Sequence, residues 1–90
     1  MTARERIECA GYEDVVILEN FSYDDALIGV THDNRAVYDY DKMIEWLCCT
    51  KGFTVEDAVE WIDYNTIRAL SYAGVEAPII FYPIHEEDYR

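Results

Sequence analysis

The stretch from Thr54 to Leu70 (TVEDAVEWIDYNTIRAL) carries the strongest periodic pattern in the chain. Small and apolar side chains recur in it at three- and four-residue spacing, which is typical of an amphipathic helix packed on a core. Thr54 is an N-cap acceptor, and Asp57 three residues later predicts a capping box that fixes the start of this helix. The predicted apolar face consists of Val55, Ala58, Val59, Ile62, Thr66 and Ala69.

The outer face of the same helix is acidic. Glu56, Glu60 and Asp63 follow one another at i, i+4 and i+7, with Asp57 beside them. Carboxylates in a first helical turn stabilise the helix by about 0.3 to 1 kcal/mol, whereas like charges at i, i+4 cost a few tenths. Glu60 and Asp63 lie beyond that turn, so helix stability does not require them. Two interpretations remain open, a solvated face and a partner-binding surface.

The whole chain is strongly acidic, with 19 acidic against 7 basic residues and a formal net charge of −12 over 90 residues. This length predicts a single domain, residues 1–90, with an ordered core from about residue 12 to 84. Hydrophobic residues make up 51% of the sequence, enough to form a folded core. A charge of this sign repels nucleic acid and anionic membranes, so the expected partner is a protein with a basic surface.

The remaining patterns predict an α+β fold, a small sheet of three to four strands including a β-hairpin, with two helices packed on one face. The other helix precedes Thr54 in the chain. It is expected to start at Asp39 or Asp41 and to end at Gly52, which suits a left-handed C-cap. The expected strands are Val15–Leu18, Ala26–Thr31, Arg35–Asp39 and Ile79–Tyr82, with a turn at His32–Asn34 inside the hairpin.

Catalytic, metal and cofactor motifs are not found in the sequence. His32 beside Asp33 is interpreted as part of the turn, because no nucleophile motif accompanies it. Cys9, Cys48 and Cys49 form no CxxC pair and are expected to be reduced thiols, with Cys48 or Cys49 facing the core. The absence of an N-terminal apolar run favours the cytosol. These observations predict a non-enzymatic protein without cofactor or metal.

Tyrosine and tryptophan are abundant, at eight and two residues. Trp61 and Tyr64 lie off the main apolar stripe of the Thr54–Leu70 helix, next to Glu60 and Asp63. Aromatic side chains flanked by carboxylates are plausible anchors for an arginine-rich groove. The alternative is that both rings pack against the neighbouring helix and the loop after it.

Two segments resemble a family of small, mostly uncharacterised proteins of bacteria, phages and mobile elements. They are DNRAVYDYDKMIEWL (Asp33–Leu47) and DAVEWIDYNTIRAL (Asp57–Leu70), and the resemblance covers roughly residues 14–83. A proline is expected in many relatives where this chain has Ser71. Small acidic proteins of mobile elements are similar in type to anti-CRISPR inhibitors, which present carboxylates where a nuclease binds phosphates.

The resemblance and the charge together suggest a non-enzymatic inhibitor that mimics nucleic acid and binds a host defence nuclease such as a CRISPR effector. The alternative is another protein-interaction module, antitoxin-like or an adaptor, that uses the aromatic patch. The expected partner-binding residues are Asp24, Asp25, Glu56, Asp57, Glu60, Trp61, Asp63, Tyr64, Glu86, Glu87 and Asp88.

Overall fold

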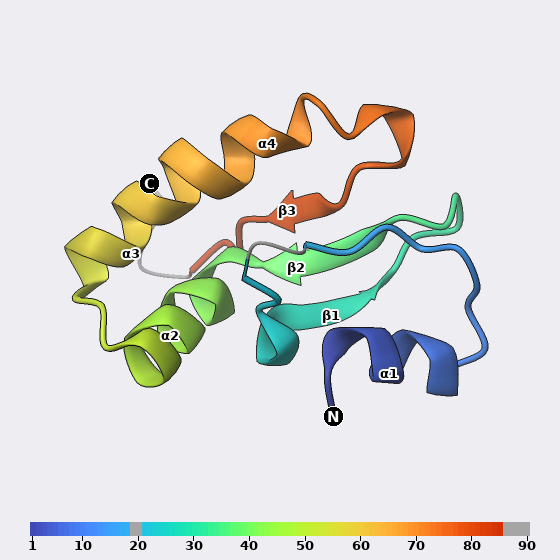
Figure 1. Ribbon diagram of the computed structural model, residues 1–90, viewed down its shortest axis with the longest axis horizontal. Helices are drawn as coiled ribbons and strands as arrows, with labels where there is room; N and C mark the ends of the chain where they lie inside the picture. The colour runs from blue at the N-terminus through green and yellow to red at the C-terminus, as the bar shows by residue number, and fades with distance from the viewer. Residues whose placement is uncertain (19–20, 86–90) are drawn as a thin grey trace.

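A computed structural model describes residues 1–18 and 21–85 of the chain. Its centre is a three-stranded mixed sheet in the order β1-β2-β3 (Figure 1). Strand β1 (Leu27–Val30) pairs antiparallel with β2 (Ala36–Asp39), and β2 pairs parallel with β3 (Ile79–Phe81). The predicted α+β class and the predicted hairpin are therefore confirmed.

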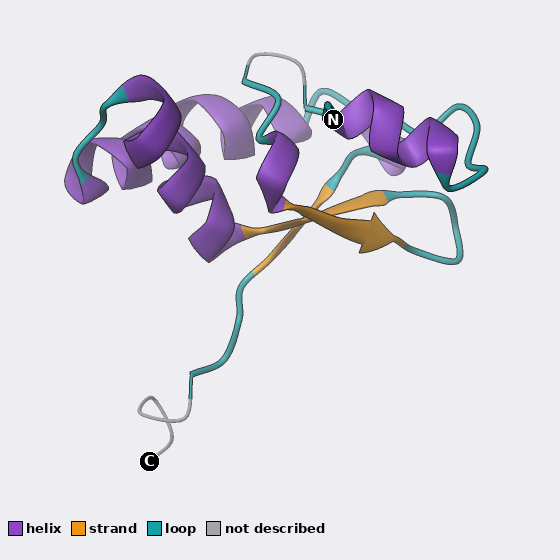
Figure 2. Cartoon of the chain, turned by 90° about the horizontal axis from the view of Figure 1, so that it is seen from below, coloured by secondary structure: helices purple, strands orange, loops and turns teal. Residues whose placement is uncertain are grey.

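The helices lie together on one face of this sheet. They are α1 (Ala3–Cys9), α2 (Tyr40–Lys51), α3 (Val55–Trp61) and α4 (Arg68–Leu70), with single 3₁₀ turns at Asp24–Ala26 and Gly74–Glu76. Figure 2 views the sheet close to edge-on and shows that its other face is covered by no helix of the described chain. Among the described helices, none is long and apolar enough to cross a membrane.

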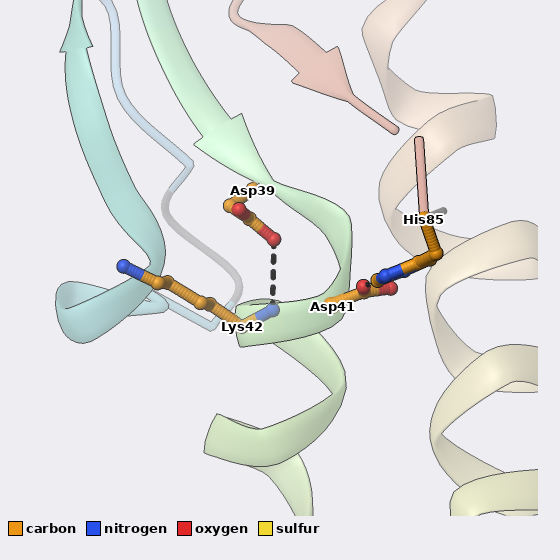
Figure 3. Close-up of polar contacts among 4 residues, drawn as sticks. All are labelled: Asp39, Asp41, Lys42 and His85. Atoms are coloured by element: carbon orange, nitrogen blue, oxygen red, sulfur yellow. Dashed lines mark hydrogen bonds and ion pairs between the residues drawn. The ribbon is translucent and has the colours of Figure 1, made fainter. Parts of the chain in front are cut away.

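Helix α2 begins and ends as the sequence predicts. The Asp39 side chain accepts a hydrogen bond from the Lys42 backbone N–H at 3.1 Å, which satisfies a donor at the start of the helix (Figure 3). At the other end Gly52 has φ 72°, a left-handed conformation that glycine adopts without a steric cost from a Cβ. The helix faces the core through Met43 and Leu47, which are fully buried.

The helix predicted over Thr54–Leu70 is one continuous rod, but its middle is not α-helical. A π-helical segment, Ile62–Ile67, joins α3 to α4. Only Ala58, Ile62 and Thr66 of the predicted apolar face are buried, whereas Val55 and Ala69 are exposed. The wider π turn shifts the side chains that follow it relative to a regular 3.6-residue period. The π turn precedes Ala69, whereas Val55 is exposed in the first turn of α3, before that segment. The predicted apolar stripe is wrong at both of its ends.

Thr54 caps this rod, because its Oγ1 accepts from the Asp57 backbone N–H at 3.1 Å. Within the described residues, the reciprocal bond from the Asp57 carboxylate that a full capping box requires is not formed. We expect Thr54→Ala to lower the free energy of unfolding by about 1 kcal/mol, because the Asp57 N–H loses its acceptor. Urea denaturation would measure this, with Thr54→Ser as the control that keeps the acceptor and the stability.

The segment Val15–Leu18 is not a strand, so that prediction is wrong. Its backbone groups bond to side chains instead of a neighbouring strand. Arg4 Nη1 donates to the Val15 carbonyl oxygen at 3.1 Å, and the Leu18 N–H donates to the Tyr38 hydroxyl at 3.2 Å. The apolar run is explained by packing alone, since Val15 is 1% exposed and belongs to the core.

The N-terminal residues also belong to the core, which extends beyond the predicted limit at residue 12. Helix α1 carries a complete capping box between Thr2 and Glu5. Ala3 and Ile7 are buried on its inner side. A helix this short gains most of its stability from such tertiary packing.

Two fully buried tyrosines, Tyr23 and Tyr38, connect the layers. The Tyr23 hydroxyl shares a 2.8 Å hydrogen bond with Thr66 Oγ1, which joins the turn before β1 to the π-helical segment. Burial raises the pKa of both tyrosines above the ordinary value of 10.0, and hydrogen bonds to their oxygens oppose this only in part.

These raised pKa values predict a loss of stability at alkaline pH. Below pH 10 both folded and unfolded chains keep the tyrosine protons; above it the unfolded chain loses its protons first, so the free energy of unfolding falls as pH rises toward the folded-state pKa. Urea denaturation between pH 8 and 11 should show a shallower decline for Tyr23→Phe than for the wild type. Tyr72→Phe, which removes the hydroxyl of a 90% exposed side chain, is the matched control variant.

Candidate functional site: an acidic aromatic face on α3

The carboxylates of α3 point away from the core. Because Ala58 and Ile62 face the core, the opposite side of the rod carries Glu56, Asp57, Glu60 and Asp63, which are all exposed. In the described part of the chain, the ion pair that the structure forms is His85–Asp41, and none of these four carboxylates has a basic partner. The α3 face is thus a negative surface that the described chain does not neutralise.

A shallow hollow lies on this face. Three aromatic rings and two carboxylates share it, together with one amide, and its volume is about 390 Å³. Its lining residues are Phe53, Asp57, Glu60, Trp61, Tyr64 and Asn65. Four predicted partner-binding residues, Asp57, Glu60, Trp61 and Tyr64, are therefore brought together at one place.

Trp61 packs inside the molecule, as one of the two interpretations of the sequence expects, and its role as a partner anchor stays a prediction. Its ring stacks on Phe21 with centroids 4.7 Å apart and meets Phe53 edge-on at 6.0 Å, so it packs against the loop before β1 and the loop before α3. It also lines the hollow. Tyr64 differs, since its side chain is 67% exposed and packs little.

The indole nitrogen of Trp61 is buried and has no hydrogen-bond partner by geometry among the described residues. The same indole N–H is close enough to the Tyr23 hydroxyl to oppose the rise in the pKa of Tyr23. The two observations agree if the contact is electrostatic but too poorly aligned to be a hydrogen bond. Trp61 is therefore fixed mainly by ring packing.

Asp63 belongs to a different neighbourhood. The rings of Tyr40 and Tyr82 pack with centroids 4.7 Å apart, where the start of α2 meets the residue after β3. Burial raises the pKa of both tyrosines, and the Asp63 carboxylate adds to the rise. Asp63 therefore lies near the tyrosine pair and is not among the residues that line the hollow.

Beside this tyrosine pair, His85 Nε2 lies 2.7 Å from Asp41 Oδ2 (Figure 3). Both side chains are nearly half exposed, at 46% and 45%, so water screens the pair. The contact joins the chain after β3 to the first turn of α2. The predicted acidic residues Glu86, Glu87 and Asp88 follow it and lie outside the described residues.

The partner-binding role predicted for Asp24 conflicts with its use inside the molecule. Its Oδ1 accepts a 2.7 Å hydrogen bond from the Ala3 N–H, and its backbone carbonyl accepts from Arg6 Nη1 at 2.7 Å. A carboxylate at a helix N-terminus is stabilised by the helix dipole, so Asp24 anchors α1. Asp25 is exposed but lines a separate depression with Lys42 and Trp46 of α2.

Phe53 and Asn65 line the hollow but were not among the residues predicted to bind a partner. Phe53 is the aromatic residue of the two. It lies just past the Gly52 C-cap, four residues before Asp57 and eight before Trp61. Spacings of four and eight residues place Phe53 on the helical stripe of Asp57 and Trp61, continued past the N-cap Thr54. This spacing is the signal that could have identified Phe53.

The chemistry available elsewhere is limited. No group of three or more His, Cys, Asp or Glu side chains in the described residues is placed to hold a metal ion. His32 is exposed in the hairpin turn, where Asn34 adopts φ 67° as predicted for a turn residue. The three cysteines are free thiols; Cys48 is half-buried and packs against the core, while Cys9 and Cys49 are exposed.

No protein-family model, curated protein or solved structure matches this chain. The family resemblance read from the sequence therefore stays a prediction. What the described residues define is an α+β domain with an acidic, aromatic face on one helix.

Proposed function

We propose that this protein is a non-enzymatic inhibitor that binds a basic, nucleic-acid-binding surface of a host defence nuclease, such as a CRISPR effector, in the bacterial cytosol. The observation that carries the proposal is the α3 face, where Glu56, Asp57 and Glu60 are exposed without a basic partner in the described chain. Such a face attracts a surface that normally binds phosphates.

The spacing of these carboxylates suits the mimicry of a nucleic-acid strand. Side chains one helical turn apart have Cβ atoms about 5 to 6 Å from each other, which is close to the distance between neighbouring phosphates. The net charge of −12 adds a long-range attraction that speeds encounter with a basic channel. Nucleic acid itself would be repelled, so the partner is a protein.

A second candidate function is a protein-interaction module of another kind, antitoxin-like or an adaptor, in which the rings supply most of the affinity. The hollow lined by Phe53, Trp61 and Tyr64 favours it, since aromatic side chains dominate many interface hot spots. The two functions differ in salt dependence. A phosphate mimic loses much of its affinity between 50 and 200 mM salt, whereas an aromatic anchor loses little.

The experiment is capture of purified CRISPR effectors and other defence nucleases on the immobilised protein, with and without guide RNA, at several salt concentrations. We expect a captured nuclease to be displaced by its own DNA or guide RNA and to lose activity when bound. Capture that persists in excess nucleic acid and in high salt would contradict the mimic and favour the aromatic module.

A further inference from the structure

We infer that the hollow on α3 is a binding site for the side chain of one arginine of the partner protein. The inference rests on the proposed function and names the chemical group that the acidic face recognises. Its residues are Phe53, Trp61 and Tyr64 as aromatic walls and Asp57 and Glu60 as charged ones, with Asn65 at the same depression.

The aromatic side chains that line the hollow suit a cation. The ring quadrupole attracts a cation placed within about 6 Å of the ring centroid, and tryptophan is the best of the three ring types. Trp61 is held in place by its stack on Phe21 and its edge contact with Phe53. Because the ring is already ordered, little conformational entropy is lost when a ligand binds to it.

The same aromatic cluster already binds a cation of the protein itself. Lys51 Nζ lies 5.0 Å from the centroid of the Phe21 ring and 5.7 Å from that of Trp46. Phe21 also stacks on Trp61. The rings of this cluster therefore contact the Lys51 cation through Phe21 and Trp46, and line the hollow through Trp61. Among the described residues, no Lys or Arg lines the hollow, and Asp57 and Glu60 stand there instead.

The carboxylates distinguish this depression from an ordinary apolar groove. A neutral aromatic or aliphatic side chain would have to bind beside two negative charges, whereas a cation gains from both. Arginine suits the site better than lysine, because its guanidinium is planar, stacks on aromatic faces, is weakly hydrated and donates bidentate hydrogen bonds to a carboxylate. An arginine of a phosphate-binding surface is thus the expected occupant.

The test uses peptides and does not require the nuclease. The peptides Ac-Gly-Arg-Gly-NH₂ and Ac-Gly-Lys-Gly-NH₂ are titrated at constant ionic strength, and the two indole N–H signals are followed by ¹H–¹⁵N NMR. Trp61 lines the hollow and Trp46 does not, so Trp46 is an internal reference. We expect a saturable shift of the Trp61 signal, tighter for the arginine peptide, and little change at Trp46.

Variants then assign the contact. Tyr64→Leu and Glu60→Gln should each weaken the arginine peptide by about two- to thirtyfold, the range of a single cation–π or carboxylate contact. Glu76→Gln, at an exposed carboxylate outside the hollow and outside the α3 face, should leave it unchanged. Circular dichroism verifies the fold of each variant, and both Tyr64 and Glu60 are exposed.

An absent or non-saturable Trp61 shift, or an equal response to both peptides, would overturn the arginine site. If a nuclease is captured but the peptides do not shift the Trp61 signal, the proposed function is supported and the arginine site is not. Selective arginine binding without capture of any nuclease would support the site and count against the proposed function.

Discussion

Glu56→Lys combined with Glu60→Lys is expected to weaken partner binding on the order of a hundredfold or more. Both carboxylates are exposed one turn apart on α3, and in the described chain neither has a basic partner. Reversing them places like charges against the basic surface of the partner, a juxtaposition that costs several kcal/mol. The loss is measured as the change in Kd by biolayer interferometry against the nuclease identified in the capture experiment.

A matched double variant distinguishes the effect of the α3 face on binding from the effect of the total charge. Glu8→Lys with Glu13→Lys changes the net charge by the same amount, and both residues are exposed on or just after α1, in a part of the chain remote in sequence from α3. We expect only a small loss for this pair, seen mainly in the association rate. If both double variants lose the same affinity, overall charge and not the α3 face determines binding.

Ile62→Ala is expected to lower the free energy of unfolding by about 2 to 5 kcal/mol. Ile62 is 0% exposed and is the first residue of the π-helical segment, packed in the main core cluster. Its truncation removes buried apolar surface and leaves a cavity in a small core that has little room to relax. For a domain of 90 residues, this is a large part of the whole stability. Urea denaturation followed by tryptophan fluorescence would measure it.

The control for this prediction is Val55→Ala in the same rod. The periodic pattern of the sequence places Val55 and Ile62 on one apolar face, but Val55 is 61% exposed in the structure. We therefore expect Val55→Ala to change stability by no more than about 0.5 kcal/mol. Equal costs at the two positions would contradict the burial that the structure gives Ile62 and the exposure that it gives Val55.

The structure also places the α3 face relative to the rest of the protein. The helices cover one side of the sheet (Figure 2). On α3, Glu56, Asp57 and Glu60 are exposed, whereas Ala58 is buried. A partner can therefore engage the hollow while the core residues beneath α3 stay packed. The π-helical segment begins within this site, directly after Trp61. Such segments are frequent at functional sites of helices.

The local signals in the sequence were sufficient for the elements that depend on neighbouring residues. The caps at Asp39, Gly52 and Thr54 were predicted because each acts on backbone groups within a few residues of itself. The hairpin was predicted because its turn residues and flanking apolar runs are adjacent in the chain. The exposure of the α3 carboxylates followed from helical spacing.

Long-range contacts decided the rest. Val15–Leu18 has the composition of a strand, but its backbone forms hydrogen bonds with the Tyr38 hydroxyl and the Arg4 side chain. These partners are distant in the sequence, so no local pattern predicts them. In the sequence, Asp24 has the features of a surface acid. In the structure, its carboxylate accepts a hydrogen bond from the N–H of Ala3 in α1.

By itself, the sequence determined the fold class, the helix caps and the acidic face, because each depends on local spacing and composition. Only the tertiary structure decided which acids are used inside the molecule, since Asp24 accepts a hydrogen bond from the Ala3 N–H and anchors α1. It also made the hollow, by bringing Phe53 beside Trp61 and by stacking Phe21 beneath that ring. The contact with Phe21 joins residues forty positions apart, which no helical period relates.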